Sequence, residues 1–469
     1  MAYTVLDLFA GGGGFSTGFQ MARRGDSRFE IIKAVELNED ACNTLRNHLG
    51  ENKVIEGDLT KKEIKDRIIA ECLGVDVIIG GPPCQTYSLA GPARSGKPEM
   101  REALRTDPRN TLFRHFFDLV GQIRPRIVVF ENVEGIISKQ LDTEEELSKK
   151  QQIAIEVICD ELESLGYSTR IEGDLVKRYQ VLNAVNYGVP QQRKRVIIIA
   201  NNQNQLNPTL DVLNYEIDQT LLQAIGRLPV VLPEISVSRM KSLINLNVIT
   251  QNLEKSLYAF VGSIKNLKDT YKEQPEVNSD EFNKIIRYFD ECLPKLLSKK
   301  YKKLIYLEEF LRGYNNLVKK YVERHLAHRQ SHISREHNIR DVVMFSMMKP
   351  GSSSAQFMNK ASLFYDKFLD ELYPYDRTKH VDTYVRHSWN KPSNTILSHM
   401  EKDGLKFIHP DQPRTFTPYE AALIQSFPPD YVFSGGRNAQ YRQIGNAVPP
   451  LLARSIGEAI LELLENMDR

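Results

Sequence analysis

Cysteine and long apolar stretches are both scarce in this chain, and each scarcity excludes a class of protein. The 469 residues contain five cysteines, which are scattered, odd in number and without Cys-x-x-Cys or Cys/His spacing. Neither a disulfide framework nor a metal site is therefore expected, and a reducing, intracellular setting fits this usage best. The N-terminal MAYTVLDLFAGGGG carries no charged leader and no long apolar stretch. We therefore expect a soluble, cytoplasmic protein with no membrane partner.

An excess of either charge sign is also lacking. Lys and Arg total 62 and Asp and Glu total 60, which gives a formal net charge of +2. The overall charge therefore does not by itself indicate a nucleic-acid partner, and any basic surface must be local. With 41% hydrophobic and 26% charged residues, the composition is that of a globular protein, and the length allows more than one domain.

Short apolar runs alternate with helical patterns from residue 1 to about residue 202. The runs that read as strands include TVLDLF, EIIKAVE, DVIIGG, RIVVFENV and RVIIIAN. This alternation predicts an α/β fold with a doubly wound, mostly parallel, Rossmann-like sheet that is covered by helices on both faces. Ligands of such sheets bind at the carboxyl ends of the strands, where the residues that carry chemistry are therefore expected.

The alternation is lost between residues 203 and 383, which read as a helical, basic insertion or a second, smaller domain. Apolar side chains there recur at spacings suited to one helix face, as in Ile285, Phe289, Leu293, Leu296 and Leu297. The lysines and arginines between residues 299 and 324 could meet phosphates, although a solvated helix face explains any one of them as well. From residue 384 to 469 the chain is compact again, and its terminal amphipathic helix could return to the first domain.

The motif DLFAGGGGFSTGF, residues 7–19, ends the first predicted strand in a glycine cluster and begins a helix. Its glycines permit a tight turn and the close approach of a ligand, and Glu36 ends the next strand, where ribose hydroxyls are commonly bound. A nucleoside-containing cofactor is therefore indicated. Taken alone the turn is weak evidence, because tight strand–helix turns need glycine anyway. Asp58, which follows the third strand, could accept a hydrogen bond from an exocyclic adenine amine. This residue alone does not identify a cofactor site.

The segment GGPPCQTYSLAG, residues 80–91, is more specific. It places Cys84 after paired prolines at the end of the fourth predicted strand, ahead of a polar loop that could move as a lid. A rigidly held cysteine at the ligand-binding edge of a sheet indicates a nucleophile. Most single cysteines are instead small buried hydrophobes, and we read the four in helix-like apolar patterns in that way: Cys42, Cys72, Cys159 and Cys292.

Two further motifs bring charged groups to the same edge. In FENVEG, residues 130–135, Glu131 ends the fifth strand beside the Cys84 loop. Partial desolvation is expected to raise its pKa, so that it could act as a proton donor, whereas a helix-capping or salt-bridged glutamate is the alternative. In VPQQRKRVIIIA, Arg193 and Arg195 flank the start of the last strand. Because they alternate across the entry to this strand, they are expected to point to opposite sides, one facing the pocket and the other supporting it.

In this order, FAGGGG, PPCQTYS, ENV, QQRKR and QIGNAVPP closely resemble the motifs of DNA cytosine-5 methyltransferases, in particular bacterial restriction–modification methylases. The resemblance extends over residues 4–200 and 384–465. It implies that Cys84 is the catalytic nucleophile, with Glu131, Arg193 and Arg195 in the same pocket. It also implies a set of residues near the methyl donor S-adenosylmethionine: Phe9, Gly11, Gly13, Glu36, Asp58, Leu59, Pro82 and Asn446.

The resemblance further implies a reaction and its partners. A methyl group would pass from S-adenosylmethionine to carbon 5 of a cytosine flipped out of double-stranded DNA, through a covalent cysteine adduct. Residues 1–202 and 384–469 would form the catalytic domain, and residues 203–383 would recognise the DNA sequence. A monomer at the bacterial nucleoid is expected, with a cognate restriction endonuclease as a further partner. Two departures are mild, since Tyr87 stands where the family often has Phe and Tyr419 where Arg is common.

Three other readings are open at this stage. An RNA cytosine methyltransferase acting on transfer RNA has the same fold, although the long middle segment favours DNA. A non-catalytic DNA-binding relative would keep the fold and lose PCQ or ENV, and both are intact here. A nicotinamide oxidoreductase would share the glycine turn but has no use for PPCQ together with ENV and QQRKR, so it ranks last.

Overall fold

The computed structural model describes most of the chain, and the residues that it describes form two compact units. The described residues are 1–82, 112–141, 152–210, 219–299, 303–329, 331–378, 380–400 and 404–469. The first unit contains Met1–Gln219 and Gln425–Arg469, and the second contains Thr220–Ile424.

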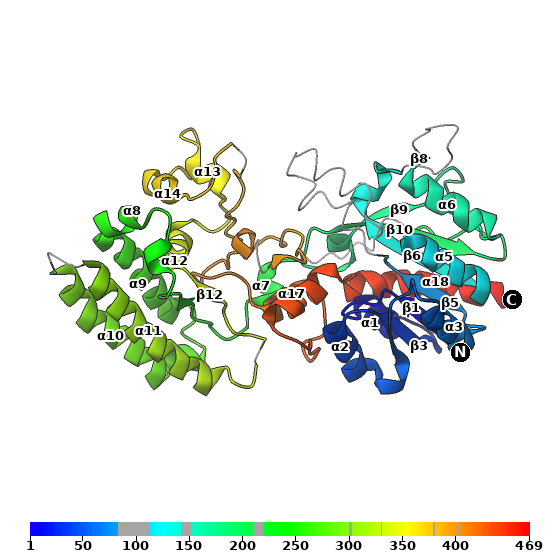
Figure 1. Cartoon of the computed structure of the whole chain (residues 1–469), viewed down its shortest axis with the longest axis horizontal. Coiled ribbons are helices and arrows are strands. Elements are labelled where there is room, and N and C mark those ends of the chain that lie inside the picture. Colours follow the sequence, from blue (N-terminus) through cyan, green and yellow to red (C-terminus); the bar gives the residue numbers. More distant parts are fainter. Residues whose placement is uncertain are drawn as a thin grey trace. The chain divides into compact units, whose positions relative to one another are not determined.

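An eight-stranded sheet forms the centre of the first unit (Figure 1). Its parallel strands are β4 (Val54–Glu56), β3 (Ser27–Glu36), β1 (Ala2–Leu8), β5 (Val77–Gly80) and β6 (Ile127–Val133). Its antiparallel strands are β2 (Arg23–Arg24) beside β3, β10 (Lys194–Asn201) beside β6 and β9 (Gln180–Asn183) beside β10. The predicted, mostly parallel sheet is confirmed. The last expected strand, β10, is antiparallel because it follows β9 through a short connection instead of a helical crossover.

Helices cover both faces of this sheet, as the sequence predicts. One face packs against α3 (Lys62–Cys72), α5 (Leu112–Ile123) and α6 (Ala154–Ser164), and the other against α1 (Gly14–Met21) and α18 (Pro450–Met467). Successive side chains of a strand point to opposite faces of the sheet. Ile78 and Val128 therefore lie in the first core, and Val77 and Val129 lie in the second. Two further helices of this unit are α2 (Glu39–Leu49) and α17 (Arg437–Asn446).

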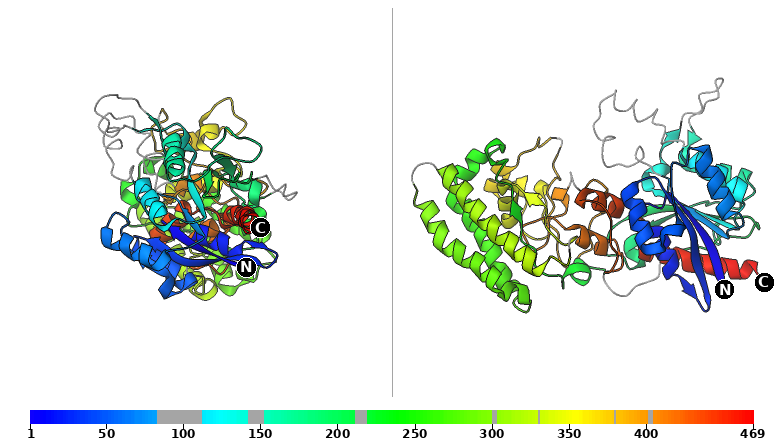
Figure 2. Two further views of the ribbon diagram at one scale, coloured as in Figure 1. Left: turned by 90° about the vertical axis from the view of Figure 1, so that its right-hand side faces the viewer. Right: turned by 60° about the horizontal axis from the view of Figure 1, so that its bottom comes forward.

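The C-terminal segment returns to the first unit, which confirms the sequence prediction. Phe15 and Phe19 of α1 share one buried core with Leu452 and Ile456 of α18, and the two helices lie against each other (Figure 2). At the end of the chain, the hydroxyl of Tyr3 donates a hydrogen bond to Asp468 at 2.6 Å. The first and last segments of the sequence therefore pack together in the same domain.

The direction of β10 decides which residues meet at the ligand-binding edge. Because β10 is antiparallel to β6, it begins where the parallel strands end. Its register pairs Arg195 with Val133 and Ile197 with Glu131. Glu131 and Arg195 are therefore diagonal neighbours on one face at the carboxyl edge of the sheet.

The second unit is mainly helical, as predicted for most of its length. Its helices are α7 (Leu221–Ile225), α8 (Leu246–Gln251), α9 (Leu253–Thr270), α10 (Asp280–Leu297), α11 (Lys303–His325), α12 (Ile339–Met347), α13 (Ser354–Met358), α14 (Lys367–Leu372) and α16 (Pro418–Ile424). The expected apolar face of α10 is confirmed, since Ile285, Phe289, Leu293 and Leu296 are buried and Leu297 packs against the same core. The second unit therefore has a hydrophobic core of its own, and many of its helical residues stabilise that core.

Short elements complete the two units. Two-residue strands pair as β7 (Gln140–Leu141) with β8 (Gln152–Ile153), and as β11 (Glu234–Ile235) with β12 (Glu336–His337). Turns of 3₁₀ helix occur at Glu51–Lys53, Glu134–Ile137, Ala184–Tyr187, Met240–Ser242, Pro275–Asn278 and Gly404–Lys406. Among the described residues, no helix is both long enough and apolar enough to cross a lipid bilayer.

The second unit extends further along the chain than the expected boundary at residue 383, reaching Ile424. The segment RTFTPYEAALI, which the sequence reading groups with the catalytic part, packs inside this unit. Its Arg414 is fully buried, donates to the carbonyl of Val231 at 3.0 Å and forms an ion pair with Glu420. The bond to Val231, together with a hydrogen bond from the N–H of Tyr419 to the carbonyl of Ser331 at 3.0 Å, joins the segment to the rest of the second unit.

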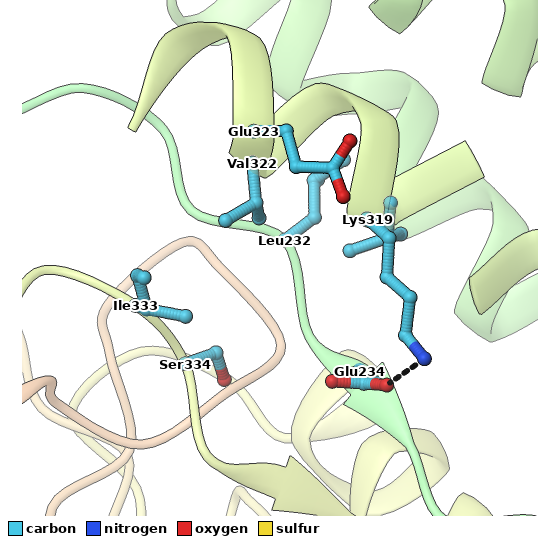
Figure 3. A pocket seen from close by; sticks show the side chains of 8 residues that line it. Leu232, Glu234, Lys319, Val322, Glu323, Ile333 and Ser334 are labelled. Carbon is cyan, nitrogen blue, oxygen red and sulfur yellow. Dashed lines mark ion pairs between the residues drawn. The ribbon is translucent and has the colours of Figure 1, made fainter. Parts of the chain in front are cut away.

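A small pocket lies within the second unit (Figure 3). Leu232, Val322 and Ile333 line it, and Lys319 lies 3.6 Å from the carboxylate of Glu234 at its rim. Aliphatic side chains and one exposed ion pair are ordinary components of a surface depression. The residues that the sequence singles out for chemistry lie instead in the first unit.

Candidate active site

The turn after β1 combines left-handed backbone with glycine. The φ angle is 59° at Phe9, 54° at Gly11 and 79° at Gly13. A positive φ strains a residue that carries a side chain, and such strain concentrates at functional sites. A Cβ placed on Gly11 would meet no described atom within 4 Å. The backbone at Gly11 therefore faces open space, into which a ligand could fit closely.

Glu36, at the end of β3, fastens this turn to the neighbouring strand. Its Oε2 accepts a hydrogen bond from the N–H of Gly11 at 2.8 Å, and its Oε1 accepts from Leu37 and Asn38 at 2.9 Å each. The side chain is half-buried. A carboxylate has about four acceptor positions, so Glu36 retains capacity for a ligand hydroxyl after these three bonds.

Asp58 and Leu59 follow β4, the strand beside β3. The half-buried Asp58 carboxylate accepts a hydrogen bond from the N–H of Thr60 at 2.9 Å, and this bond lowers its pKa and favours the ionised form. Leu59 is buried in the apolar core. Asp58 therefore presents a charged acceptor at the same edge as Glu36, while the Leu59 side chain packs inward.

The segment after β5 lies against Glu131. A Cβ on Gly81 would stand 2.5 Å from Glu131 Oε2, so only glycine allows the carboxylate to approach this closely. The side-chain amide of Asn132 donates to the carbonyl of Pro82 at 3.4 Å. Both Pro82 and Asn132 are buried. The last described residues before Cys84 are thus held directly beside Glu131.

Glu131 and Arg195 form a nearly buried ion pair. Arg195 Nε lies 2.8 Å from Glu131 Oε1, and the side chains are 10% and 11% exposed, respectively. Burial raises the pKa of Glu131, and the nearby charges of Arg195 and Arg193 offset this only in part. Burial also lowers the pKa of Arg195. The structure therefore shows both the expected rise in the pKa of Glu131 and the salt bridge that the sequence left open as the alternative. The pair presents a carboxyl group that can hold a proton beside a guanidinium group.

Arg193 makes quite different contacts. Its Nη2 donates to the backbone carbonyls of Gly445 and Ala447 at 2.8 and 3.0 Å, and the side chain is fully buried. The amide of Gln425 donates to Ala447 as well, at 2.8 Å. Between these two fixed carbonyls, Asn446 is exposed at the end of α17. Arg193 therefore anchors the backbone that presents Asn446.

Arg193 and Arg195 contact different partners, as the sequence predicts. The cause expected from the sequence, alternation of side chains along a strand, is wrong. Residues two apart point to the same face of a regular strand, so alternation within a strand cannot separate them. Arg193 instead precedes β10, which begins at Lys194, and its own carbonyl accepts from the N–H of Ala184 at 2.8 Å. The guanidinium groups of the two residues therefore reach different partners, backbone carbonyls for Arg193 and the Glu131 carboxylate for Arg195.

Cys84 and Tyr87 lie outside the described residues, and the other four cysteines can be compared with the expectation for them. Cys42, Cys72 and Cys159 are buried, and Cys292 is half-buried against the helical core of the second unit. Burial raises the pKa of the Cys42 and Cys159 thiols to about 12 and that of Cys72 to about 11. These three thiols are poor sources of thiolate, which agrees with their interpretation as small buried hydrophobes.

The structure also adds residues that sequence reasoning missed. Gly81 and Asn132 were part of quoted motifs, and their position next to Glu131 or Pro82 could have been inferred from the adjacent ends of β5 and β6. Gln425 and Tyr431 had no such signal. Gln425 contacts Ala447, and Tyr431 contacts Gly12 from the opposite end of the chain, which only the folded backbone brings together.

Comparison with known proteins decides the family. A family model described as C-5 cytosine-specific DNA methylase matches residues 3–462, almost the whole chain. The chain belongs to this family. It is a DNA cytosine-5 methyltransferase, as the ordered motifs predict, and the nicotinamide oxidoreductase reading is excluded.

Relatives of full length support the same assignment. The type II methyltransferase M.DdeI of Desulfomicrobium norvegicum is 30% identical, with 99% of this chain and 90% of the relative covered. The type II methyltransferase M1.HphI of Haemophilus parahaemolyticus is 27% identical, with 99% and 88% covered. A crystal structure described as a DNA modification methyltransferase encoded within an Escherichia coli prophage has a TM-score of 0.54 at 19% identity, with 99% of each chain covered. At that identity the structure supports the fold alone.

Proposed function

We propose that this methyltransferase uses S-adenosylmethionine to methylate carbon 5 of a cytosine that has rotated out of double-stranded DNA, through a covalent bond to Cys84. The observation that carries the proposal is the nearly buried Glu131–Arg195 pair, with its 2.8 Å contact and the raised pKa of Glu131. Glu131 belongs to β6, and its neighbour Asn132 donates a hydrogen bond to the carbonyl of Pro82. Pro82 precedes Cys84 by two residues in the sequence.

The residues around the glycine turn fit S-adenosylmethionine. The half-buried carboxylates of Glu36 and Asp58 follow neighbouring strands, as suits ribose hydroxyls and an adenine amine. The open Gly11 and the strained Phe9 belong to the turn between β1 and α1, and exposed Asn446 is the last member of the set. When bound, S-adenosylmethionine supplies an electrophilic methyl group on a sulfonium.

Cys84 supplies the electrons that cytosine lacks. Carbon 5 of cytosine is a weak nucleophile, so its attack on a methyl group needs electron density pushed into the ring. A thiolate that adds to carbon 6 forms a C–S bond and shifts the 5,6-double-bond electrons to carbon 5. After carbon 5 takes the methyl group, a base removes its proton. The electrons of that C–H bond reform the double bond and expel the thiolate.

Glu131 and Arg195 stabilise the charge that this addition creates. Negative charge develops toward ring nitrogen 3 and the carbonyl oxygen at position 2. Protonated Glu131 can donate to the nitrogen, and the Arg195 guanidinium can hold the oxygen. The surrounding burial that raises the pKa of Glu131 also strengthens both interactions, because little water screens them. Arg193 takes part by positioning the Asn446 backbone rather than by touching the base.

Recognition of the DNA sequence is assigned to the second unit. The chemistry above requires the cytosine to leave the base stack, at a cost of a few kcal/mol that contacts to the rest of the DNA must offset. The unit Thr220–Ile424 has its own core and lies between the two segments of the catalytic unit in sequence. Type II relatives favour a restriction–modification setting, with a cognate endonuclease that cuts the same site when it is unmethylated.

One assay tests this function. The purified enzyme is incubated with S-adenosylmethionine carrying a labelled methyl group and either plasmid DNA or transfer RNA, and modified positions are mapped. The proposal expects 5-methylcytosine in one short DNA sequence and no label in RNA. Label in transfer RNA alone would establish the RNA methyltransferase instead. Absence of transfer from S-adenosylmethionine to either substrate would reject the proposed cofactor and reaction.

A further inference from the structure

Tyr431 packs against the glycine turn, although it lies more than four hundred residues further along the chain. The Tyr431 hydroxyl donates a hydrogen bond to the carbonyl of Gly12 at 2.8 Å. A Cβ on Gly13 would stand 2.5 Å from the same hydroxyl oxygen. The tyrosine is thus in direct contact with two consecutive residues of the turn. Both Tyr431 and the turn belong to the first unit.

Tyr431 is itself held rigidly. Its ring is stacked on the imidazole of His48, with 3.6 Å between centroids and 8° between planes, and it packs at 4.8 Å from Phe427 and 5.1 Å from Phe433. Its side chain is buried, and burial holds the pKa of its hydroxyl above the usual range. The hydroxyl therefore stays protonated and remains a hydrogen-bond donor.

The same C-terminal segment is tied to α2, the helix that follows Glu36. The Thr44 hydroxyl donates to Gln443 at 2.7 Å and accepts from the N–H of Ser434 at 2.8 Å. His48, the residue stacked on Tyr431, is also part of α2. The segment therefore contacts both sides of the bond between Glu36 and Gly11, the turn on one side and the helix on the other.

We propose that Tyr431 is a positioning residue that fixes the glycine turn for S-adenosylmethionine, so that the C-terminal segment sets the affinity for the methyl donor. The Gly12 carbonyl belongs to the peptide between Gly12 and Gly13. A hydrogen bond that fixes this carbonyl also fixes the opposite N–H group and the left-handed conformation at Gly13. That N–H, of Gly13, donates to the carbonyl of Ala10 at 2.9 Å, so the peptide is restrained on both sides. Loss of the Tyr431 bond removes one of these two restraints, and the turn must then be ordered further on binding, which lowers affinity for the ligand.

The test is Tyr431→Phe, which keeps the ring and its packing and removes the hydroxyl. Tyr167→Phe is the matched control, because the hydroxyl of Tyr167 also donates to a buried backbone carbonyl, that of Pro125, at 2.8 Å. Both variants lose a neutral hydrogen bond to a backbone carbonyl in the same unit, so both melting temperatures should fall. Only Tyr431→Phe should change the binding of S-adenosylmethionine.

The readouts are the Kd for S-adenosylmethionine by calorimetry, and kcat and both KM values at saturating partner concentration. Tyr431→Phe should raise Kd and KM for S-adenosylmethionine about two- to tenfold, the range of one neutral hydrogen bond, and leave kcat and KM for DNA unchanged. A Kd unchanged in Tyr431→Phe, or raised equally in Tyr167→Phe, would overturn the inference.

The inference rests on the proposed function. Failure of the wild-type enzyme to bind S-adenosylmethionine would therefore reject both, whereas wild-type binding with an unchanged variant would reject this one alone.

Discussion

Each unit of the molecule contains a buried pair of glutamate and arginine, and the two pairs differ in geometry. In the first unit, Arg195 reaches Glu131 through one nitrogen at 2.8 Å, and both side chains remain about a tenth exposed. In the second unit, Arg414 meets Glu420 through two nitrogens at 2.7 Å each, and the side chains are 0% and 1% exposed. The first pair is accessible at a sheet edge, and the second is sealed.

The pKa values of the two glutamates shift in opposite directions. Burial raises the pKa of Glu131, with Arg195 only partly offsetting it. Burial also opposes ionisation of Glu420, but the charge and two hydrogen bonds of Arg414 outweigh it and hold the pKa well below the usual range. The N–H of Thr417 adds a further bond at 2.8 Å. The pair with two hydrogen bonds between its side chains is therefore structural. The pair joined through one nitrogen leaves a carboxyl group that is able to carry a proton.

The largest effect on turnover is expected from Glu131→Gln. The substitution keeps the shape and removes the transferable proton, so kcat should fall about a hundredfold to ten-thousandfold while the melting temperature changes little. Wild-type kcat should also fall as pH rises through the raised pKa of Glu131, because the donor is then lost. Steady-state rates measured across pH check both points.

The control is Glu134→Gln, three residues further on, where the exposed carboxylate lies 3.2 Å from Lys194. It should leave the rate and its pH profile unchanged. A fully active Glu131→Gln enzyme would remove the functional difference between the two buried pairs.

The largest effect on stability is expected from Glu420→Ala. It leaves the Arg414 charge buried without its partner, and breaking such a pair costs about 3–5 kcal/mol. Denaturant unfolding monitored in the second unit measures the loss. The comparison is Glu308→Ala, which removes a pair with Arg312 that water screens and should cost far less. Equal losses in the two variants would show that the Arg414–Glu420 pair does not hold the unit together.

A smaller effect is expected at a third carboxylate, Glu36, whose partners are backbone N–H groups rather than an arginine. Glu36→Ala should weaken binding of S-adenosylmethionine by about 1–3 kcal/mol, the range for a lost charged hydrogen bond. Calorimetric titration gives the value. Glu30→Ala on the same strand removes only an exposed pair with Lys53 and should leave affinity unchanged. Unchanged binding in Glu36→Ala would remove this residue from the cofactor site.

The sequence carries enough signal for most of the first unit. Short apolar runs that end in glycine or acid predict both the parallel strands and the edge where Glu36, Asp58 and Glu131 lie, because every parallel strand ends at the same side. The direction of β10 was not predictable in this way. It depends on the β9–β10 connection, which has no helical pattern to mark a crossover.

Long-range polar contacts account for the remaining differences. The resemblance placed RTFTPYEAALI with the catalytic part, whereas a hydrogen bond from Arg414 to the carbonyl of Val231 joins it to the second unit. The anchoring of Gly445 and Ala447 by Arg193, and the support of Gly12 by Tyr431, join residues more than two hundred positions apart. No periodicity in the sequence reports such pairs, so only the folded chain identifies these positioning residues.

The covalent step at Cys84 is tested most directly with DNA that carries 5-fluorocytosine at the target site. Fluorine cannot leave carbon 5 as a proton does, so the enzyme should remain attached after methyl transfer. The account predicts an adduct that requires S-adenosylmethionine, survives denaturant and maps by peptide mass analysis to Cys84. The Cys84→Ala protein should bind DNA but form none. An adduct at any of the other four cysteines, or methylation by Cys84→Ala, would contradict the account.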